Sequence, residues 1–303
     1  MKLAIIINPI SGKHGHLADT GASKYAHARQ LISGPGLEAD VVLTTARGHG
    51  AALARGYVAQ RYDVVIAWGG DGTVNEIAGP LIGTPTALAI VRSGSGDGLA
   101  RSLGLPRDVD RALQAALQGP SSATAIDVGY LGDRHFLNIA GVGFDATIAT
   151  VFNRGARRGG MGYVRNGLKG VWSYEPRQYA LRFDDETANG RYFLVAFANG
   201  REYGNGIVLA PSADLRDGWL DVVTVDAGPA WKQLWRSRRL AIGRERPAEG
   251  VHRTRVRSAT VSGEHLHCHV DGEAFETAGD LEVTIRPRSL QVCGLASPTS
   301  VAG

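Results

Sequence analysis

A glycine-rich stretch constrains this chain most strongly: residues 68–76 read Trp-Gly-Gly-Asp-Gly-Thr-Val-Asn-Glu. It lies between a buried-strand pattern at residues 63–67 and a helix expected to begin near Val74. Glycines let the backbone approach an anion closely, and N–H groups at a helix N-terminus favour negative charge. Asp71 adds a carboxylate that can hold a hydrated magnesium ion. The stretch therefore predicts a phosphate cradle, although a plain strand-to-helix turn is the alternative.

The same stretch excludes one common class of nucleotide site. A Walker A loop ends in Gly-Lys followed by Ser or Thr, and this sequence does not. An ordinary P-loop NTPase is therefore disfavoured.

A second candidate phosphate loop follows the first apolar run of the chain, at residues 3–7. The loop reads Asn8-Pro9-Ile10-Ser11-Gly12-Lys13. Asn8 and Ser11 offer side-chain hydrogen bonds, Gly12 an unobstructed N–H and Lys13 a positive charge. An Asn-Pro turn after an edge strand would explain the same residues without a ligand.

A third loop, residues 92–101, follows a strand pattern at residues 86–91 and reads Arg-Ser-Gly-Ser-Gly-Asp-Gly-Leu-Ala-Arg. It resembles the dinucleotide fingerprint Gly-x-Gly-x-x-Gly, but its third glycine, Gly98, comes one position early, which disfavours an NAD site. Loops that leave the carboxyl ends of parallel strands meet along one edge of the sheet. Ligands of open α/β sheets bind at that edge.

The pattern of apolar residues changes near residue 122. Before it, strand-like runs alternate with helical patterns at residues 17–33, 50–61 and 107–118. This alternation predicts an α/β domain with a doubly wound parallel sheet. After it, short alternating segments predict a mainly antiparallel β-sandwich, with helical inserts at about 160–173 and 229–242. We expect domains at 1–122 and 123–287, with the tail at 288–303 packing back on the first.

Five segments together resemble the diacylglycerol kinase catalytic-domain family, which includes bacterial lipid kinases and sphingosine kinases. The segments agree with the family in order and spacing, and they are residues 8–13, 69–76, 94–101, 214–221 and 270–273. The resemblance implies a fold like that of NAD kinase and diacylglycerol kinase. It implies ATP and Mg²⁺ as cofactors, a nucleotide-binding first domain and a lipid-binding second domain.

The resemblance assigns nucleotide contacts to the three loops and to a threonine at the end of the strand pattern at 39–44, which is Thr44 or, as the alternative, Thr45. The residues implied are Asn8, Pro9, Ser11, Gly12, Lys13, Thr44, Gly69, Gly70, Asp71, Gly72, Thr73, Asn75, Glu76, Gly94, Ser95 and Asp97. One departure concerns the third loop, where Asp97 replaces the usual Asn and Gly98 replaces an Asp of many members. If that Asp organises magnesium in relatives, its role is vacant here or shifted to Asp97.

The resemblance also assigns a catalytic base and a structural metal site. Glu273 is the first choice for accepting the proton of the lipid hydroxyl, with Asp271 as its partner or the alternative base. An ordinary Asp-Gly hairpin turn is the competing interpretation. Asp217, with Asp214 and Trp219, is implied to hold a structural magnesium ion, and a turn closed by Asp217-Gly218 without an ion is the alternative.

Composition points to a cytoplasmic protein that contacts membranes peripherally. The 303 residues carry a net charge of +4, no apolar run long enough to span a bilayer and no signal-type start. Basic residues lie among aromatic ones at 152–172 and 231–239, which suits an anionic membrane surface, although a solvated basic face is an alternative. No nucleic-acid motif is present, and the sequence leaves open whether the chain forms a homodimer.

We therefore expect a Mg²⁺-dependent lipid kinase that transfers the γ-phosphate of ATP to a hydroxyl of a diacylglycerol-like or sphingoid lipid. NAD kinase, which shares a Gly-Gly-Asp-Gly loop, is the nearest enzymatic alternative. A noncatalytic nucleotide- or lipid-binding protein is the alternative from another class. No motif distinguishes between lipid acceptors.

Overall fold

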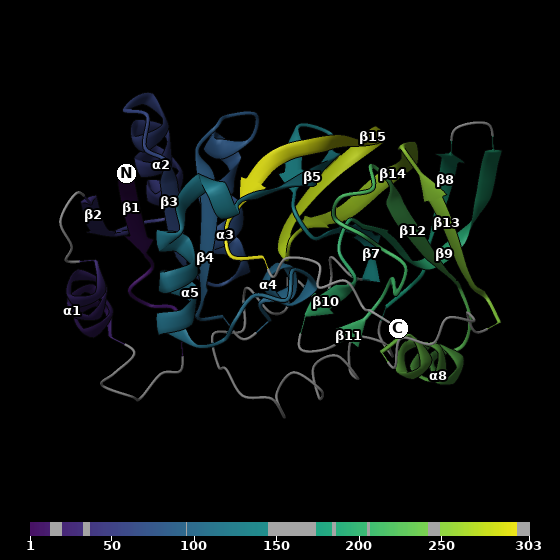
Figure 1. The fold of residues 1–303 in the computed structure, drawn as a ribbon. Coiled ribbons are helices and arrows are strands. Elements are labelled where there is room, and N and C mark those ends of the chain that lie inside the picture. Colours follow the sequence, from purple (N-terminus) through teal and green to yellow (C-terminus); the bar gives the residue numbers. More distant parts are fainter. Residues whose placement is uncertain are drawn as a thin grey trace, which may run out of the picture. The chain divides into compact units, whose positions relative to one another are not determined.

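The computed structural model describes residues 1–12, 20–32, 37–94, 96–144, 174–183, 186–204, 207–241 and 249–295. The chain divides into two compact units. The first consists of Met1–Asp127 with Pro287–Gly303, and the second of Val128–Arg286. Figure 1 shows the elements of both units.

A parallel sheet forms the centre of the first unit. Its strands pair in the order β2 (Glu38–Leu43), β1 (Lys2–Ile7), β3 (Val64–Gly69) and β4 (Ala87–Arg92). Strand β3 is buried along its whole length, as expected of a strand in a parallel sheet covered on both faces. The helical elements of this unit are α1 (Gly21–Leu31), α2 (His49–Ala59), α3 (Asp71–Ala78), η2 (Gly79–Leu81), α4 (Gly98–Ser102), α5 (Val109–Leu117) and η3 (Gly119–Ser122).

The last described strand returns to this sheet. Val292, at the end of β15 (Glu273–Val292), pairs in parallel with Leu88 of β4. The N–H of Cys293 donates to the Leu88 carbonyl oxygen at 2.8 Å. The side chain of Cys293 also belongs to the core of the first unit.

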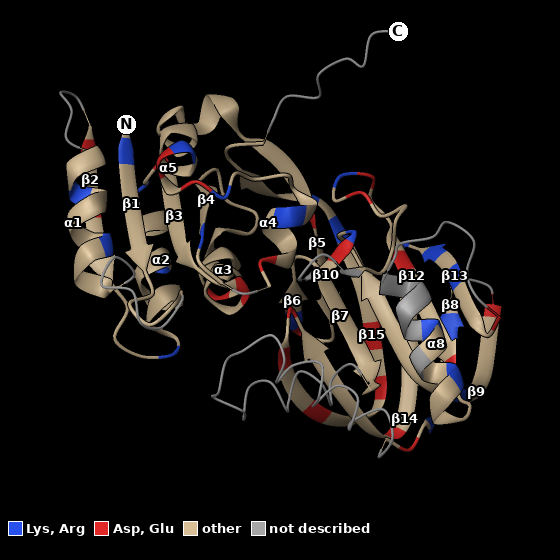
Figure 2. Ribbon diagram, turned by 90° about the horizontal axis from the view of Figure 1, so that it is seen from below, with Lys and Arg blue, Asp and Glu red and all other residues tan. Residues whose placement is uncertain are grey.

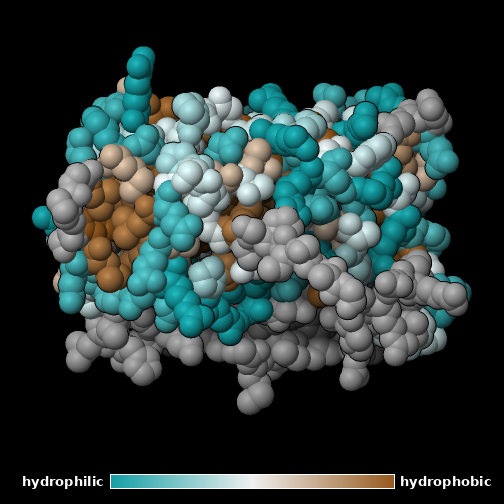
Figure 3. Space-filling model, viewed as in Figure 1, coloured by the Kyte–Doolittle hydropathy of each residue, from teal (hydrophilic) through white to brown (hydrophobic). Residues whose placement is uncertain are grey.

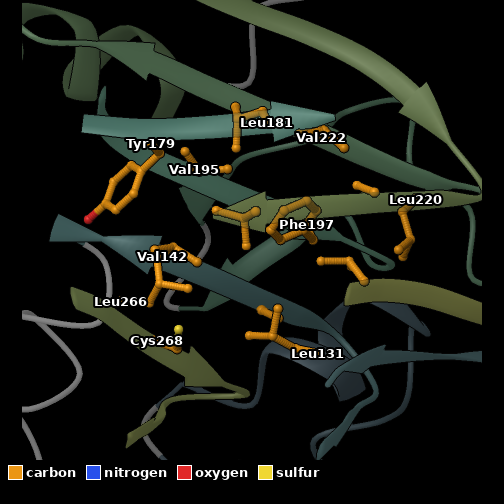
Figure 4. Packing of buried hydrophobic residues seen from close by; sticks show 14 of the residues in the cluster. Leu131, Val142, Tyr179, Leu181, Val195, Phe197, Leu220, Val222, Leu266 and Cys268 are labelled. Atoms are coloured by element: carbon orange, nitrogen blue, oxygen red, sulfur yellow. The ribbon is translucent and has the colours of Figure 1, made fainter. Parts of the chain in front are cut away.

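Antiparallel pairing dominates the second unit. Strand β9 (Glu186–Ala198) pairs with β7 (Ile139–Gly143), β8 (Arg177–Phe183) and β12 (Leu220–Asp226). Strand β14 (Ser258–Val270) pairs with β7, β8 and β15. The other strands are β5 (Thr124–Leu131), which begins in the first unit, β6 (Arg134–Phe136), β10 (Glu202–Gly204), β11 (Ile207–Val208) and β13 (Val251–Val256). Alternate apolar side chains of these strands, including Leu181, Val195 and Phe197, pack into one buried cluster (Figure 4).

Two buried polar side chains attach helix α8 (Ala230–Ala241) to the second unit. Gln233 donates to the carbonyl oxygen of Asp226 at 2.8 Å. Arg236 donates to the same oxygen at 2.9 Å and to the carbonyl oxygen of Glu249 at 2.8 Å. This helix lies where the insert at 229–242 was expected, whereas the insert expected at 160–173 falls outside the described residues.

Hydrophilic residues cover most of the face seen in Figure 3, and apolar residues gather around β1 at the left of that view. Within the part of the chain that the structure describes, no helix is long and apolar enough to cross a membrane. Both cysteines are buried, and burial raises the pKa of the Cys268 thiol to about 12 and that of Cys293 to about 11. These thiols are therefore protonated core residues.

Candidate active site

Hydrogen bonds between side chains join the three glycine-rich loops of the first unit. The amide nitrogen of Asn8 in the first loop donates to the Thr73 hydroxyl in the second at 2.9 Å. The Ser11 hydroxyl oxygen lies 2.7 Å from that of Ser93, which precedes the glycines of the third loop. The parallel strands β1, β3 and β4 thus place the loops together at one edge of the sheet, as their sequence order predicts.

Glycine is required where the second and third loops approach each other. A Cβ atom on Gly94 would lie 2.8 Å from the Gly70 Cα atom and 2.6 Å from an Asp97 carboxylate oxygen. The two loops can lie this close only because Gly94 and Gly70 lack side chains. Within the second loop, a Cβ atom on Gly69 would lie 2.4 Å from the Cβ atom of Thr73.

Helix α3 begins directly at the candidate cradle. Asp71 is its first residue, and the preceding Gly70 has no side chain with which to cap the N–H groups of the first turn. A Cβ atom on Gly96 of the third loop would lie 2.9 Å from Asp71 Oδ2, so this carboxylate lies against the third loop. Helix α3 therefore offers its N-terminus, with one carboxylate beside it, for an anion and its counter-cation.

This arrangement fits a catalytic magnesium ion. Magnesium usually takes one or two protein carboxylates together with substrate phosphates and water, and dedicated cages of protein ligands are rare. Among the described residues, no three His, Cys, Asp or Glu side chains gather into a metal-binding group. Asp71, beside a cradle for phosphates, is the residue that would hold such an ion.

Lys24 of α1 contacts the first loop, although no motif in the sequence singles it out. Its side chain is 3% exposed, and its ammonium group donates to the Ser11 carbonyl oxygen at 2.5 Å and to the Ser11 hydroxyl at 3.0 Å. The Ser11 hydroxyl in turn donates to the Asn8 carbonyl oxygen at 2.8 Å. Because a hydroxyl has one proton, Ser11 must accept from both Lys24 and Ser93, and its proton is used within the loop.

Two further residues predicted to contact the nucleotide, Glu76 and Thr44, have hydrogen bonds within the first unit. Glu76 Oε1 accepts a hydrogen bond from the Ala51 N–H at 3.2 Å, so its carboxylate lies at the N-terminus of α2. Thr44 continues the sheet, since its N–H donates to the Ile7 carbonyl oxygen at 2.8 Å. The first-loop Lys13 and the third-loop Ser95 lie outside the described residues.

Asp97 in the third loop carries a nearly buried carboxylate. It accepts the Gly94 N–H at 3.0 Å, and its other oxygen lies 3.5 Å from Nε of Arg92. Burial raises the pKa of Asp97 and lowers that of Arg92, although the charge of each partner acts in the opposite direction. Loss of solvation therefore outweighs the attraction within this pair.

In the second unit, the predicted base segment forms a two-residue hairpin between β14 and β15. Asp271 and Gly272 both have positive φ, 46° and 85°, as a type I′ turn requires. The Asp271 carboxylate accepts the N–H groups of Leu137, Asn138 and Ile139 at 2.7, 2.9 and 3.0 Å. Asp271 thus fastens the turn to the segment before β7, and this favours Glu273, the first residue of β15, as the base.

Buried polar residues support this turn, and none was predicted from the sequence. Asn199 donates to the Leu137 carbonyl oxygen at 2.7 Å, and Asn138 donates to that of Glu202 at 2.8 Å. His269 accepts the Gly272 N–H at 3.4 Å through Nδ1, and its ring meets that of Tyr203 edge-on. An isolated Asn or His inside a strand pattern has no local signature, because its partners are distant in sequence.

The segment predicted to hold a structural metal carries contacts that do not fit a cation. Asp217 accepts the Trp219 N–H at 3.0 Å with one oxygen and a guanidinium N–H of Arg255 with the other. Asp214 accepts from the backbone and the side chain of Arg216 at 3.1 and 3.2 Å. The positive charge beside Asp217 is therefore that of an arginine, and the magnesium assignment to Asp214, Asp217 and Trp219 stays a prediction that this geometry does not support.

Two domain families match the chain along most of its length. Residues 2–131 match the diacylglycerol kinase catalytic domain. Residues 138–294 match the domain described as YegS C-terminal NAD kinase beta sandwich-like.

Curated relatives carry names of the same kind. A "Probable lipid kinase YegS-like" of Chromohalobacter salexigens is 41% identical over 191 residues, which is 61% of this chain and 61% of that protein. A protein of Pseudomonas syringae with the same name is 30% identical over 85% of this chain and 84% of its own length. The Bacillus subtilis "Diacylglycerol kinase" is 29% identical over 72% of each chain.

Solved structures share the fold. A crystal structure of a diacylglycerol kinase from Bacillus anthracis superposes with a TM-score of 0.73, at 20% identity, over 99% of this chain and 98% of that one. The shared architecture is a diacylglycerol kinase-like first domain followed by a β-sandwich-like domain. On these grounds the chain belongs to the diacylglycerol kinase family, among the YegS-like proteins whose names describe phosphotransferases with a lipid alcohol as acceptor.

Proposed function

We propose that this protein is an ATP-dependent, Mg²⁺-requiring lipid kinase that phosphorylates a hydroxyl of a diacylglycerol-like or sphingoid lipid. The observation that carries the proposal is the joining of three glycine-rich loops around the N-terminus of α3, where Gly70 and Gly94 bring two backbones together beside Asp71. Backbone N–H groups and a helix N-terminus are suited to the phosphates of a nucleotide. The names of the relatives supply the lipid acceptor.

The reaction joins the hydroxyl oxygen of the lipid to the γ-phosphorus of ATP. The bond between that phosphorus and the β,γ-bridging oxygen breaks, and ADP leaves with the electron pair. The hydroxyl proton passes to the carboxylate of Glu273. Magnesium, held through Asp71, would neutralise charge on the phosphates, while the glycine loops orient them. Asp271 holds the turn that carries Glu273 and is not itself the base in this proposal.

Transfer of labelled γ-phosphate into organic-extractable product tests the proposal. Mixed micelles would present diacylglycerols, sphingosine and ceramide, with NAD as a further acceptor. We expect label in one lipid, and Asp71→Asn and Glu273→Gln should each lower turnover by on the order of 10²- to 10³-fold. Label in NAD would favour NAD kinase, and ATP binding without transfer to any acceptor would favour a noncatalytic binding protein.

We further propose that the protein acts in the cytoplasm and meets its substrate at an anionic membrane through α8. Trp231 and Trp235 are spaced four residues apart on this helix and are 63% and 49% exposed. Figure 2 shows Lys and Arg positions along α8, and residues 230–241 contain no acidic residue. Lys232 lies beside the Trp231 ring, whereas buried Gln233 and Arg236 hold the helix to the unit.

This combination of exposed Trp and positive charge suits the interface of an anionic bilayer. The basic and aromatic residues at 152–172 lie outside the described residues and add nothing to this argument. Sedimentation with phosphatidylglycerol vesicles tests the contact, using Trp231→Ser with Trp235→Ser. We expect at least tenfold weaker vesicle binding and unchanged activity on a short-chain, monomeric acceptor. Equal binding by the variant would remove α8 from the membrane contact.

A further inference from the structure

Asp97 links the two ends of the third loop. It lies immediately before α4 in a left-handed conformation, with φ 48° and ψ 43°. From there its carboxylate reaches back to the start of the loop, where one oxygen accepts the Gly94 N–H at 3.0 Å and the other lies 3.5 Å from Arg92 Nε. Left-handed backbone is unfavourable for a residue with a side chain, so these contacts hold a conformation that Asp97 would not adopt by preference.

Arg92 extends the link beyond α4. It ends β4, and its Nη1 donates to the carbonyl oxygen of Leu105 at 3.1 Å. Only 7% of the Arg92 side chain and 12% of the Asp97 side chain are exposed. One buried ion pair therefore joins the last residue of β4 to the residue directly before α4. The Arg92 guanidinium also contacts the segment that follows α4.

The pair lies directly behind the contact between the second and third loops. Gly94, whose N–H Asp97 binds, is the residue whose Cα approaches Gly70. If the Asp97 carboxylate did not hold this N–H, the third loop could move away from the cradle at the N-terminus of α3. The position of the third loop thus depends on a side chain whose contacts are with the Gly94 N–H and with Arg92.

We propose that Asp97 is a positioning residue whose buried carboxylate, paired with Arg92, holds the third loop against the second, and that it is not a magnesium ligand. The inference rests on the proposed function, because it concerns the nucleotide site of that reaction. Asp97 stands where the family has an Asn, and the positive charge of Arg92 at the end of β4 balances its negative charge.

In a buried ion pair, a single substitution costs more than the double substitution. Removing one partner leaves the other charged and buried, whereas replacing both with neutral side chains of similar size removes that cost. Asp97→Asn keeps an oxygen that can accept the Gly94 N–H, and Arg92→Met keeps much of the length of the arginine stem. The two variants therefore test charge compensation with little change in shape.

The experiment is a double-mutant cycle with Asp97→Asn, Arg92→Met and the double variant, read by calorimetric ATP binding, by thermal unfolding and by the magnesium dependence of turnover. We expect each single variant to weaken ATP binding by about tenfold or more, with the double variant binding better than Asp97→Asn alone. The magnesium concentration for half-maximal turnover should stay within about twofold of the wild-type value in all variants that turn over.

Additive effects of the two substitutions on ATP binding would overturn the proposal. So would a large rise in the magnesium requirement of Asp97→Asn alone, because that would mark a metal ligand. If a single variant does not fold, a folded double variant supports the ion pair and an unfolded one refutes it. ATP binding and unfolding need no lipid acceptor, so failure to find a lipid substrate would count against the proposed function and leave this test intact.

Discussion

The Asp71 loop of the first unit and the Asp271 turn of the second use an aspartate beside glycine in opposite ways. Asp71 starts a helix whose cap residue has no side chain, and glycines bring a neighbouring loop close to its carboxylate. Asp271 accepts three backbone N–H groups from one segment of its own unit. The first arrangement suits an incoming anion and cation, whereas the second uses the carboxylate to hold the fold.

Asp71 is therefore placed to act on a ligand, whereas Asp271 stabilises the fold. Both oxygens of the Asp271 carboxylate accept backbone N–H groups, one from Leu137 and the other from Asn138 and Ile139. This carboxylate is therefore engaged in holding the turn. Glu273, two residues further along and partly exposed, is the better candidate for the base.

Asp271→Ala should therefore destabilise the protein more than any other change discussed. Three N–H groups would lose a charged acceptor, and we expect the free energy of unfolding to fall by about 3 kcal/mol or more. Urea unfolding followed by circular dichroism measures it. Glu273→Gln is the matched control, with an expected change within about 0.5 kcal/mol. An Asp271→Ala variant as stable as the wild type but inactive would contradict the comparison and restore Asp271 as a base.

The loops of the first unit and the hairpin of the second could both be predicted from the sequence. Glycine loops after apolar runs predicted the three loop positions, because parallel strands necessarily bring their carboxyl ends to one edge. Asp-Gly between two strand patterns predicted the hairpin as an alternative, and the φ angles of Asp271 and Gly272 confirm that turn. Both signals are local in sequence.

Contacts between distant residues had no such signal. Lys24 lies in the middle of a helix pattern, and only the folded chain shows that its amine reaches Ser11. Arg92 begins the third-loop motif, and its pairing with Asp97 requires the left-handed turn before α4. Glu76 belongs to the second-loop motif, and only the folded chain shows that its carboxylate accepts the Ala51 N–H at the start of α2. In all three cases the contact depends on residues that are distant in sequence.

Gly94→Ala tests the close approach of loops in the first unit. The added methyl group would lie 2.6 Å from an Asp97 oxygen and 2.8 Å from the Gly70 Cα atom, so the loops must separate. A displacement of about 1 Å at a reacting group costs on the order of 10²-fold in rate, and we expect a loss of this size in kcat/KM for ATP. Steady-state kinetics at saturating lipid measures it.

Gly56→Ala is the control, because it lies within α2 and the nearest atom to an added Cβ is 4.0 Å away. This substitution should stabilise the protein by about 0.5–1 kcal/mol and leave the kinetics unchanged. If Gly94→Ala behaves like Gly56→Ala, the cradle does not depend on contact between the loops.

Asp221 is a third aspartate held by contacts within the fold, and its substitution should have a smaller effect on stability than Asp271→Ala. Its carboxylate is buried in the second unit, where Ser212 donates to it at 2.5 Å and Arg255 Nε lies 3.8 Å away. Burial raises its pKa, and the hydrogen bond from Ser212 and the charge of Arg255 offset this only in part. Unlike Asp271, which binds three N–H groups, this carboxylate is held with too few donors to replace its hydration.

A raised folded-state pKa fixes the sign of the pH dependence. Between the ordinary Asp value near 3.8 and the higher folded value, the native state binds a proton that the unfolded chain has released. This contribution to stability is complete below the unfolded value and is lost as the pH rises through the folded value. The stability of the wild type relative to Asp221→Asn should therefore fall as the pH rises from about 4 toward 7. Urea unfolding of both proteins across this range measures the difference, and Asp280→Asn, changed at an exposed position, controls for the lost charge. A difference that rises with pH would show that the hydrogen bond from Ser212 and the charge of Arg255 outweigh burial.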